Sequence, residues 1–148
     1  MKRRNKLRTC LHIVWATKGR APLITSEIER RVFAIVQAIF QNNKCAVLAI
    51  NGMPDHIHVL IVLPTTIGIG TLMGRVKGGS SRIIAEEIVP DGNFRWQPNY
   101  GAFAVSESHR KRVVRYILNQ KQHHANGSCW PEAEETDEED TDFGYGIS

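Results

Sequence analysis

The stretch Met53-Pro54-Asp55-His56-Ile57-His58-Val59-Leu60-Ile61-Val62-Leu63 decides the fold. Its first residues are typical of a turn, and the apolar run that follows predicts a buried strand. Side chains at alternate positions of a strand point to the same face of the sheet, so His56 and His58 should project together and Ile57 to the opposite face. Two imidazoles on one rigid element can form half of a metal site, or they can simply hydrogen-bond to neighbouring groups.

The chain on either side of this stretch predicts further strands and helices. We expect strands over residues 8–17, 45–50, 94–97 and 101–105, with a turn at Asn51-Gly52. We expect helices over residues 26–42, 65–89 and 107–124, the first opened by a Ser26/Glu29 capping box. This order predicts an α+β fold of the ferredoxin-like (RRM-like) type. Its antiparallel sheet carries helices packed on one face, and a C-terminal helix bears Tyr116.

Charge is distributed unevenly along the chain. The net charge of +4 combines +12 over residues 1–130 with −8 over the remaining residues. A body this basic is typical of proteins that bind nucleic acid, with a solvated charged surface as the alternative. We therefore expect a catalytic or binding domain over residues 1–124, followed by a loosely ordered acidic tail over residues 125–148.

Basic and hydroxyl residues that could contact a DNA backbone occur after the first strand, within the second helix and on the last helix. The candidate DNA-binding residues are Arg75, Lys77, Ser80, Ser81, Arg82, Lys18, Arg20 and Arg115. Two adjacent glycines, Gly78 and Gly79, interrupt the second helix, which must either break there or allow another group to approach closely.

Aromatic residues offer a second possible contact with nucleic acid, because unpaired bases stack on aromatic rings. Tyr100 could do so, whereas core packing is the simpler expectation for Trp15 and Trp96. His12 could face the sheet surface that contacts DNA, or it could lie in the core or at a sheet edge.

Tyr116 and Gln120 lie one turn apart on the last predicted helix and hence on one face. A helical tyrosine is more often a packing residue than a nucleophile, and a glutamine is ordinarily a surface amide. His123 and His124 could be ligands in place of Gln120. However, adjacent helix positions diverge by about 100° and cannot both join one site.

The cysteines and the apolar runs exclude two other classes of protein. Cys10, Cys45 and Cys129 are widely spaced and predict neither a disulfide framework nor a thiolate zinc site. No apolar run is long enough to span a membrane, and the N-terminus is too polar for a signal peptide. We therefore expect a cytoplasmic protein with no membrane partner.

Five blocks in unbroken order resemble the small single-tyrosine HUH transposases of the IS200/IS605 insertion-sequence family and their REP-associated relatives. They are His12-Ile13-Val14-Trp15-Ala16-Thr17-Lys18, Gly52-Met53-Pro54-Asp55-His56-Ile57-His58, Lys77-Gly78-x-Ser80-Ser81-Arg82, Trp96-Gln97-x-x-Tyr100-Gly101-Ala102-Phe103 and Tyr116-x-x-x-Gln120. The resemblance covers about residues 9–124, and beyond His124 the chain departs from the family pattern.

The resemblance implies a homodimeric enzyme that cuts and rejoins single-stranded DNA at the foot of a hairpin, without an organic cofactor. Tyr116 matches the nucleophile, which would form a 5′-phosphotyrosine intermediate. His56 and His58 match the pair that holds Mg²⁺ or Mn²⁺, and Gln120 matches the third protein ligand. The alternative is a non-catalytic, domesticated module that only binds hairpin or single-stranded nucleic acid.

Overall fold

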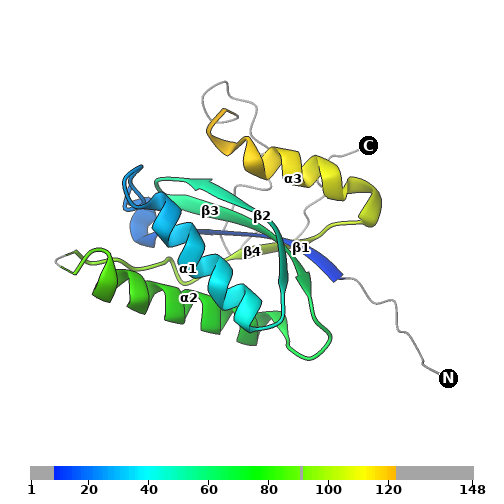
Figure 1. The fold of residues 1–148 in the computed structure, drawn as a ribbon, viewed down its shortest axis with the longest axis horizontal. Coiled ribbons are helices and arrows are strands. Elements are labelled where there is room, and N and C mark those ends of the chain that lie inside the picture. Colours follow the sequence, from blue (N-terminus) through cyan, green and yellow to red (C-terminus); the bar gives the residue numbers. More distant parts are fainter. Residues whose placement is uncertain (1–8, 91, 123–148) are drawn as a thin grey trace.

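The computed structural model describes residues 9–90 and 92–122, in which a four-stranded antiparallel sheet lies between helices (Figure 1). The strands are β1 (Thr9–Ala16), β2 (Ala46–Met53), β3 (His56–Leu63) and β4 (Gly101–Ala104). The helices are α1 (Glu29–Asn42), α2 (Ile69–Glu87) and α3 (Arg110–Leu118), with 3-10 turns η1 (Lys18–Arg20) and η2 (Glu107–His109). The strand order β2-β3-β1-β4 confirms the predicted ferredoxin-like α+β fold.

Some sequence predictions concern residues outside these ranges. They are the basic N-terminal residues, His123, His124, Cys129 and the acidic tail.

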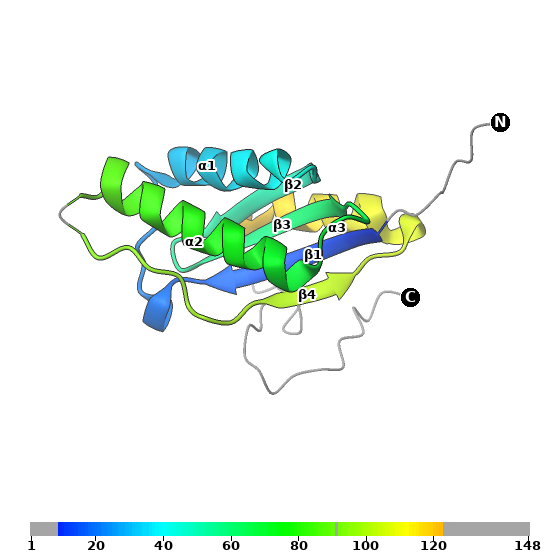
Figure 2. The same cartoon turned by 90° about the horizontal axis from the view of Figure 1, so that it is seen from below.

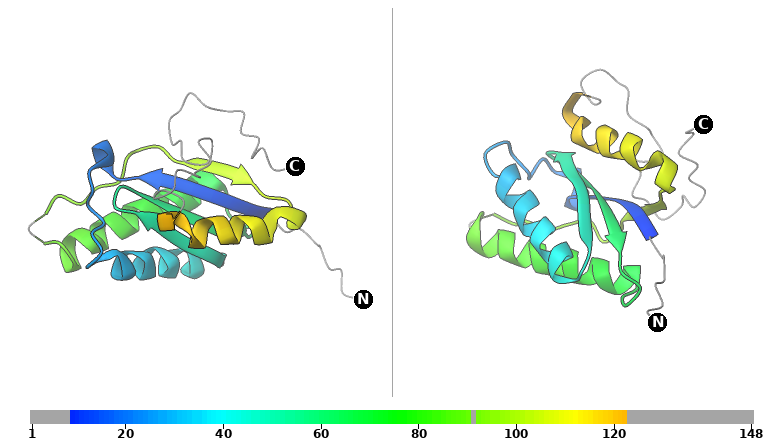
Figure 3. Two further views of the ribbon diagram at one scale, coloured as in Figure 1. Left: turned by 90° about the horizontal axis from the view of Figure 1, so that it is seen from above. Right: turned by 45° about the vertical axis from the view of Figure 1, so that its right-hand side comes forward.

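Both faces of the sheet are covered (Figures 2 and 3). Helices α1 and α2 cover the face that carries Ile13, Trp15 and Ile57, and this layer forms the larger core. Helix α3 covers the opposite face, where its apolar side chains pack on Cys10 and Leu60. The alternation of side chains along β1 and β3 therefore assigns each strand residue to one of two cores.

The hairpin between β2 and β3 turns later than the sequence predicted. Met53 pairs with His56, so the turn consists of Pro54 and Asp55, and the predicted turn at Asn51-Gly52 is wrong because both residues lie within β2. Gly52 instead allows a close backbone approach, since a Cβ atom there would lie 2.3 Å from the carbonyl oxygen of His56.

The helices also differ from prediction at their ends. The Ser26/Glu29 capping box does not form, because α1 begins at Glu29 and has Ile28 as its N-cap, with no side-chain cap. Helix α2 runs unbroken through both adjacent glycines. A Cβ atom on Gly79 would lie 3.3 Å from Ile39 Cδ1 on α1, so close helix packing accounts for this glycine.

The C-terminal part of the fold is shorter than predicted. Helix α3 ends at Leu118, where Asn119 leaves helical geometry (φ −100°, ψ 23°), and residues 120–122 are helical again. Of the strand predicted over 94–97, only an isolated bridge between Trp96 and Thr17 forms. Within the described residues, no helix is both long and apolar enough to cross a bilayer.

The role of Gly52 gives a first prediction. Gly52→Ala should lower the free energy of unfolding by about 1–3 kcal/mol or more, because the new methyl group overlaps backbone rather than a flexible side chain. Gly78→Ala is the matched control. Open space surrounds that position on α2, so the higher helix propensity of alanine should stabilise the protein by about 1 kcal/mol. Chemical denaturation of both variants measures the difference, and equal effects would contradict this account of the hairpin.

Candidate active site

The histidine pair lies on the face of the sheet that α3 covers. His56 and His58 project to the same side of β3, and their ring centroids are 5.1 Å apart. Ile57 points into the core on the opposite face, as predicted. Both imidazoles are almost entirely buried, with exposed fractions of 1% and 0%.

Each imidazole of the pair is held through its Nδ1 atom. His56 Nδ1 lies 2.7 Å from Asp55 Oδ1, and His58 Nδ1 lies 2.8 Å from His12 Nε2. The hydrogen bond from His56 holds the pKa of the Asp55 carboxyl below its usual value. With Nδ1 engaged in both rings, Nε2 is the nitrogen of each that could bind a cation. Such partners orient metal-binding imidazoles in many proteins.

Tyr116 lies over this pair in the same chain. Val113, Tyr116 and Ile117 share one face of α3, and this face is buried against the sheet. The Tyr116 ring centroid lies 5.8 Å from that of His58 and 6.3 Å from that of His12. Only 2% of Tyr116 is exposed. Tyr116 therefore both packs in the core beneath α3 and lies next to the imidazoles.

Gln120 is fully buried, and neither amide atom has a hydrogen-bond partner among the described residues. Its neighbours attach this end of α3 to β2. Asn51 Nδ2 donates to the Leu118 carbonyl at 2.9 Å, and Lys121 Nζ donates to the Gly52 carbonyl at 3.2 Å. Asn51 in turn pairs with His58 across the β2–β3 ladder. The chain around Gln120 is thus attached to β2, the strand that pairs with the strand of the histidine pair.

The chemistry of this group of side chains suits a divalent cation with an amide ligand. Among the described residues, no three His, Cys, Asp or Glu side chains are grouped so that they could hold a metal ion. Beside His56 and His58, the buried amide of Gln120 could supply a third protein ligand. A buried polar group without a partner is costly, and a bound cation would satisfy the amide oxygen.

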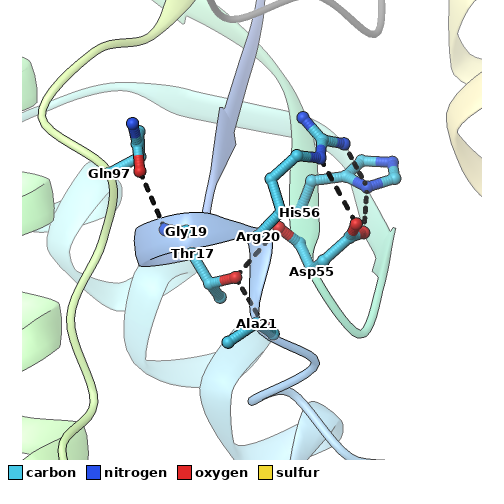
Figure 4. A network of polar contacts seen from close by, with 7 residues as sticks. All are labelled: Thr17, Gly19, Arg20, Ala21, Asp55, His56 and Gln97. Carbon is cyan, nitrogen blue, oxygen red and sulfur yellow. Dashed lines mark hydrogen bonds and ion pairs between the residues drawn. The ribbon is translucent and has the colours of Figure 1, made fainter.

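The turn η1 brings a positive charge to the edge of the site (Figure 4). Gly19 and Arg20 both have positive φ, at 64° and 53°, and a non-glycine residue in this conformation costs about 1–3 kcal/mol. The strained turn directs the Arg20 guanidinium to Asp55, with Nε 3.4 Å from Oδ2. Arg20 Nη2 also lies 3.5 Å from His56 Nδ1. His56 Nδ1 lies closer to Asp55 Oδ1, however, so its main partner is the carboxylate.

The expected DNA-binding residues divide into two groups. Arg20 is exposed beside the histidine pair, Lys18 is exposed in the same turn η1, and Arg115 is exposed on the outer side of α3. Arg75, Ser81 and Arg82 lie on α2 and hence across the sheet from the pair. Arg75 Nη1 donates to Asn43 Oδ1 at 2.8 Å. Arg82 and Ser81 line an open groove of about 450 Å³ between α2 and residues 94–98.

Two of these predicted DNA contacts disagree with the structure. Ser80 is fully buried, and its hydroxyl accepts a hydrogen bond from Trp96 Nε1 at 2.8 Å. Lys77 Nζ donates to the carbonyls of residues 97–99, with distances of 2.7 Å to Pro98 and 3.1 Å to Asn99. Burial lowers the pKa of Lys77 to about 8. Both side chains therefore hold the segment before β4, and their polar groups are engaged by other groups of the protein.

Two residues of the site are not predicted as such from the sequence. Asp55 is expected only in the turn, although a carboxylate directly before a histidine pair can orient the first imidazole. His12 is expected on the DNA-contacting sheet surface, in the core or at a sheet edge, and only the pairing of β1 with β3 brings it to His58. Trp15 and Trp96 do pack in the core, as expected.

The chain is similar to known proteins along most of its length. A family model described as "Transposase IS200 like" matches residues 6–120. The ISDra2 transposase TnpA of Deinococcus radiodurans is 29% identical over 115 residues, which are 74% of this chain and 81% of that protein. The transposase for insertion sequence element IS200 of Salmonella typhimurium is 32% identical over 76 residues, which are 51% of this chain and 50% of that protein.

Two solved structures share the fold. A crystal structure of a proposed transposase from Deinococcus radiodurans R1 has a TM-score of 0.63 at 28% identity, covering 81% of this chain and 98% of that chain. A REP-associated tyrosine transposase bound to a REP hairpin has a TM-score of 0.62 at 15% identity, covering 84% and 73%. Because the second structure is only 15% identical in sequence, its similarity concerns the fold alone.

The carbonyl contacts of Lys77 give the second prediction. Lys77→Met should lower the free energy of unfolding by about 1–3 kcal/mol, because three carbonyls lose a charged donor. Hydrogen exchange should also speed up at the amides of Gly19 and Gln97, which depend on the same segment. The control is Arg82→Met, an exposed residue of the same helix, which should leave both measurements unchanged. Unaltered exchange in Lys77→Met would contradict the supporting role.

Proposed function

The chain belongs to the IS200-like transposase family, and from this premise we propose that it cleaves and rejoins single-stranded DNA with Tyr116 as the nucleophile. The observation that carries the proposal is the contact of the Tyr116 ring with His58, at 5.8 Å between centroids, within one chain. The same ring also lies 6.3 Å from that of His12, so Tyr116 packs against two imidazoles.

In the proposed reaction, the Tyr116 oxygen attacks the phosphorus of the scissile phosphodiester. A bond forms between the phenolic oxygen and phosphorus, and the bond from phosphorus to the 3′ oxygen breaks. The phenol gives up its proton, and the departing 3′ oxygen gains one to become a 3′ hydroxyl. The products are a 5′-phosphotyrosine link and a DNA end that can later reverse the step. One phosphodiester replaces another, so no ATP is required.

A phenol has a pKa near 10 and is a weak nucleophile at neutral pH, so it needs assistance. We propose that His56, His58 and Gln120 hold a divalent ion, Mg²⁺ or Mn²⁺, through two imidazole nitrogens and an amide oxygen. When bound, the ion would polarise the phosphate oxygens. The family resemblance implies these two ions, whereas imidazole ligands alone would suit a softer metal. Asp55 orients His56 by accepting the Nδ1 proton.

The proposed substrate is single-stranded DNA that carries a hairpin. Arg20, beside His56, and Lys18, in the same turn η1, have exposed side chains that can neutralise phosphates. Arg115 extends this positive charge onto α3. Arg75, Ser81 and Arg82, on the other side of the sheet, could contact a second part of a folded DNA. We also propose, from the family resemblance, that the chain acts as a homodimer.

Access to Tyr116 requires movement, because only 2% of this residue is exposed. We propose that α3 separates from the sheet, so that a phosphate can reach the phenolic oxygen. Ser106, which precedes η2 in extended conformation, offers a place for such a hinge. We propose that DNA binding beside Arg20 accompanies this opening.

The nucleophile assignment gives the third prediction. Incubation of the full chain with hairpin-bearing single-stranded DNA and Mn²⁺ should yield a covalent adduct that survives denaturation. Tyr116→Phe should abolish the adduct, because it lacks the attacking oxygen. Tyr100→Phe is the control and should retain the adduct, since Tyr100 lies near Lys77 at the other side of the sheet. Denaturing gel electrophoresis of labelled DNA measures both.

Two outcomes would contradict this assignment in different ways. An adduct that persists in Tyr116→Phe would mean that another residue is the nucleophile. Complete absence of an adduct with any single-stranded DNA, combined with tight binding, would favour the non-catalytic nucleic-acid-binding module. The burial of Tyr116 is the observation that favours this second function.

The basic residues beside the site give the fourth prediction. DNA affinity should fall steeply as salt rises, because each phosphate contact releases counterions. Arg20→Gln should reduce the slope of log affinity against log salt by about 0.7–1. Arg30→Gln, an exposed residue on α1, should leave the slope unchanged. Fluorescence anisotropy over a range of salt concentrations measures both variants, and equal slopes would remove Arg20 from the DNA interface.

A further inference from the structure

We propose that His12 is a positioning residue that determines which nitrogen of His58 can bind the divalent ion. The inference rests on the function proposed above. It concerns a residue of β1, the strand next to the histidine pair, and it assigns to His12 a role toward His58 like that of Asp55 toward His56.

The two imidazoles are in direct contact. His12 Nε2 lies 2.8 Å from His58 Nδ1, and both residues are fully buried. Their ring centroids are 5.1 Å apart, with 30° between the ring planes. Val14 pairs with His58 and His12 pairs with Leu60, so the two histidines are diagonal neighbours on one face of the sheet. Diagonal neighbours are within reach of ring side chains.

The surroundings of His12 hold its ring in place. Phe103, opposite His12 on β4, has its ring centroid 6.0 Å away, and Tyr116 on α3 lies at 6.3 Å. Both aromatic rings are tilted steeply against the imidazole, at 64° and 72°. His12 therefore lies between the sheet, the proposed nucleophile and the proposed metal ligand, where a rotation of its ring would meet another side chain.

The contact matters because two neutral rings share one proton between the two nitrogens. If His58 Nδ1 donates, His58 Nε2 carries the lone pair that a cation needs. If His12 Nε2 donates instead, His58 must carry its proton on Nε2 and cannot bind a cation there. The proposed metal site therefore requires His12 to act as the acceptor. The hydrogen bond on one ring nitrogen commonly sets the binding role of the other.

Substitutions of His12 that differ in size and in hydrogen-bond acceptor can distinguish a structural role from a positioning role. Glutamine can place its amide oxygen where His12 Nε2 lies. Methionine has nearly the same length and volume as glutamine but offers only a weak acceptor. Asparagine also carries an amide, but its side chain is shorter and ends near the position of His12 Nδ1, too far from His58. Only glutamine should therefore preserve the contact with His58.

The experiment measures Mn²⁺ binding to the full chain by electron paramagnetic resonance, in the absence of DNA. His12→Gln should bind Mn²⁺ within a few-fold of the unsubstituted protein. His12→Met and His12→Asn should bind about 10–100-fold more weakly, the usual effect of losing an orienting partner. His109→Gln, a histidine of η2 that contacts Ser106, is the control and should bind normally. Thermal unfolding of each variant verifies that it is folded.

The outcomes distinguish the two levels of the proposal. If the unsubstituted protein binds no Mn²⁺, the metal site fails and the role of His12 fails with it. If it binds Mn²⁺ and His12→Met binds equally well, only the role of His12 is overturned. Equal weakening in folded His12→Gln and His12→Met would also overturn it, because size rather than the acceptor would then matter. Recovery confined to glutamine would establish the positioning role.

Discussion

The alternation of side chains along β3 is the constraint on which the rest of the structure depends. It sends Ile57, Val59 and Ile61 to one face of the sheet, and His56 and His58 to the other. The first face requires α1 and α2 as cover. The second is partly polar and lies beneath α3, so its imidazoles must find partners inside the protein. Asp55 and His12 are such partners among the described residues, and both come from segments next to β3.

A chain of hydrogen bonds connects the histidine pair to the helix on the opposite face of the sheet. On the α2 side, Ser80 binds Trp96, and Lys77 binds the carbonyls that follow it. The side-chain oxygen of Gln97 then accepts from the Gly19 amide at 3.0 Å, within the turn that presents Arg20 to Asp55 (Figure 4). Sequence blocks that looked like separate DNA contacts therefore form one connected scaffold, which begins at α2 and ends at His56.

Sequence analysis could predict what depends on local periodicity. The alternation in β3, the helical spacing in α1 and the order of elements were enough for the fold. It could not predict contacts set by tertiary packing. The Asn51-Gly52 signal suggested a turn, but Gly52 is needed for backbone clearance at His56. The hydroxyl of Ser80 suggested a surface contact, but helix α2 turns it toward Trp96. His12 meets His58 only through strand pairing, which no local pattern encodes.

Tyr116 is buried and helps to hold α3 on the sheet, whereas its proposed role as nucleophile requires it to be exposed. Helix α3 has only nine residues, too few for a stable isolated helix, so its structure depends on docking against the sheet. Full burial of one large apolar side chain contributes about 1.5–3 kcal/mol, and Val113, Tyr116 and Ile117 supply most of this contact. Separation of α3 would therefore cost several such contributions at once. Under the proposed function, binding of the negatively charged substrate beside Lys18 and Arg20 must offset that cost. A nucleophile that also serves as a packing residue would then be exposed chiefly when DNA is present, which would limit reaction of the phenol with other molecules.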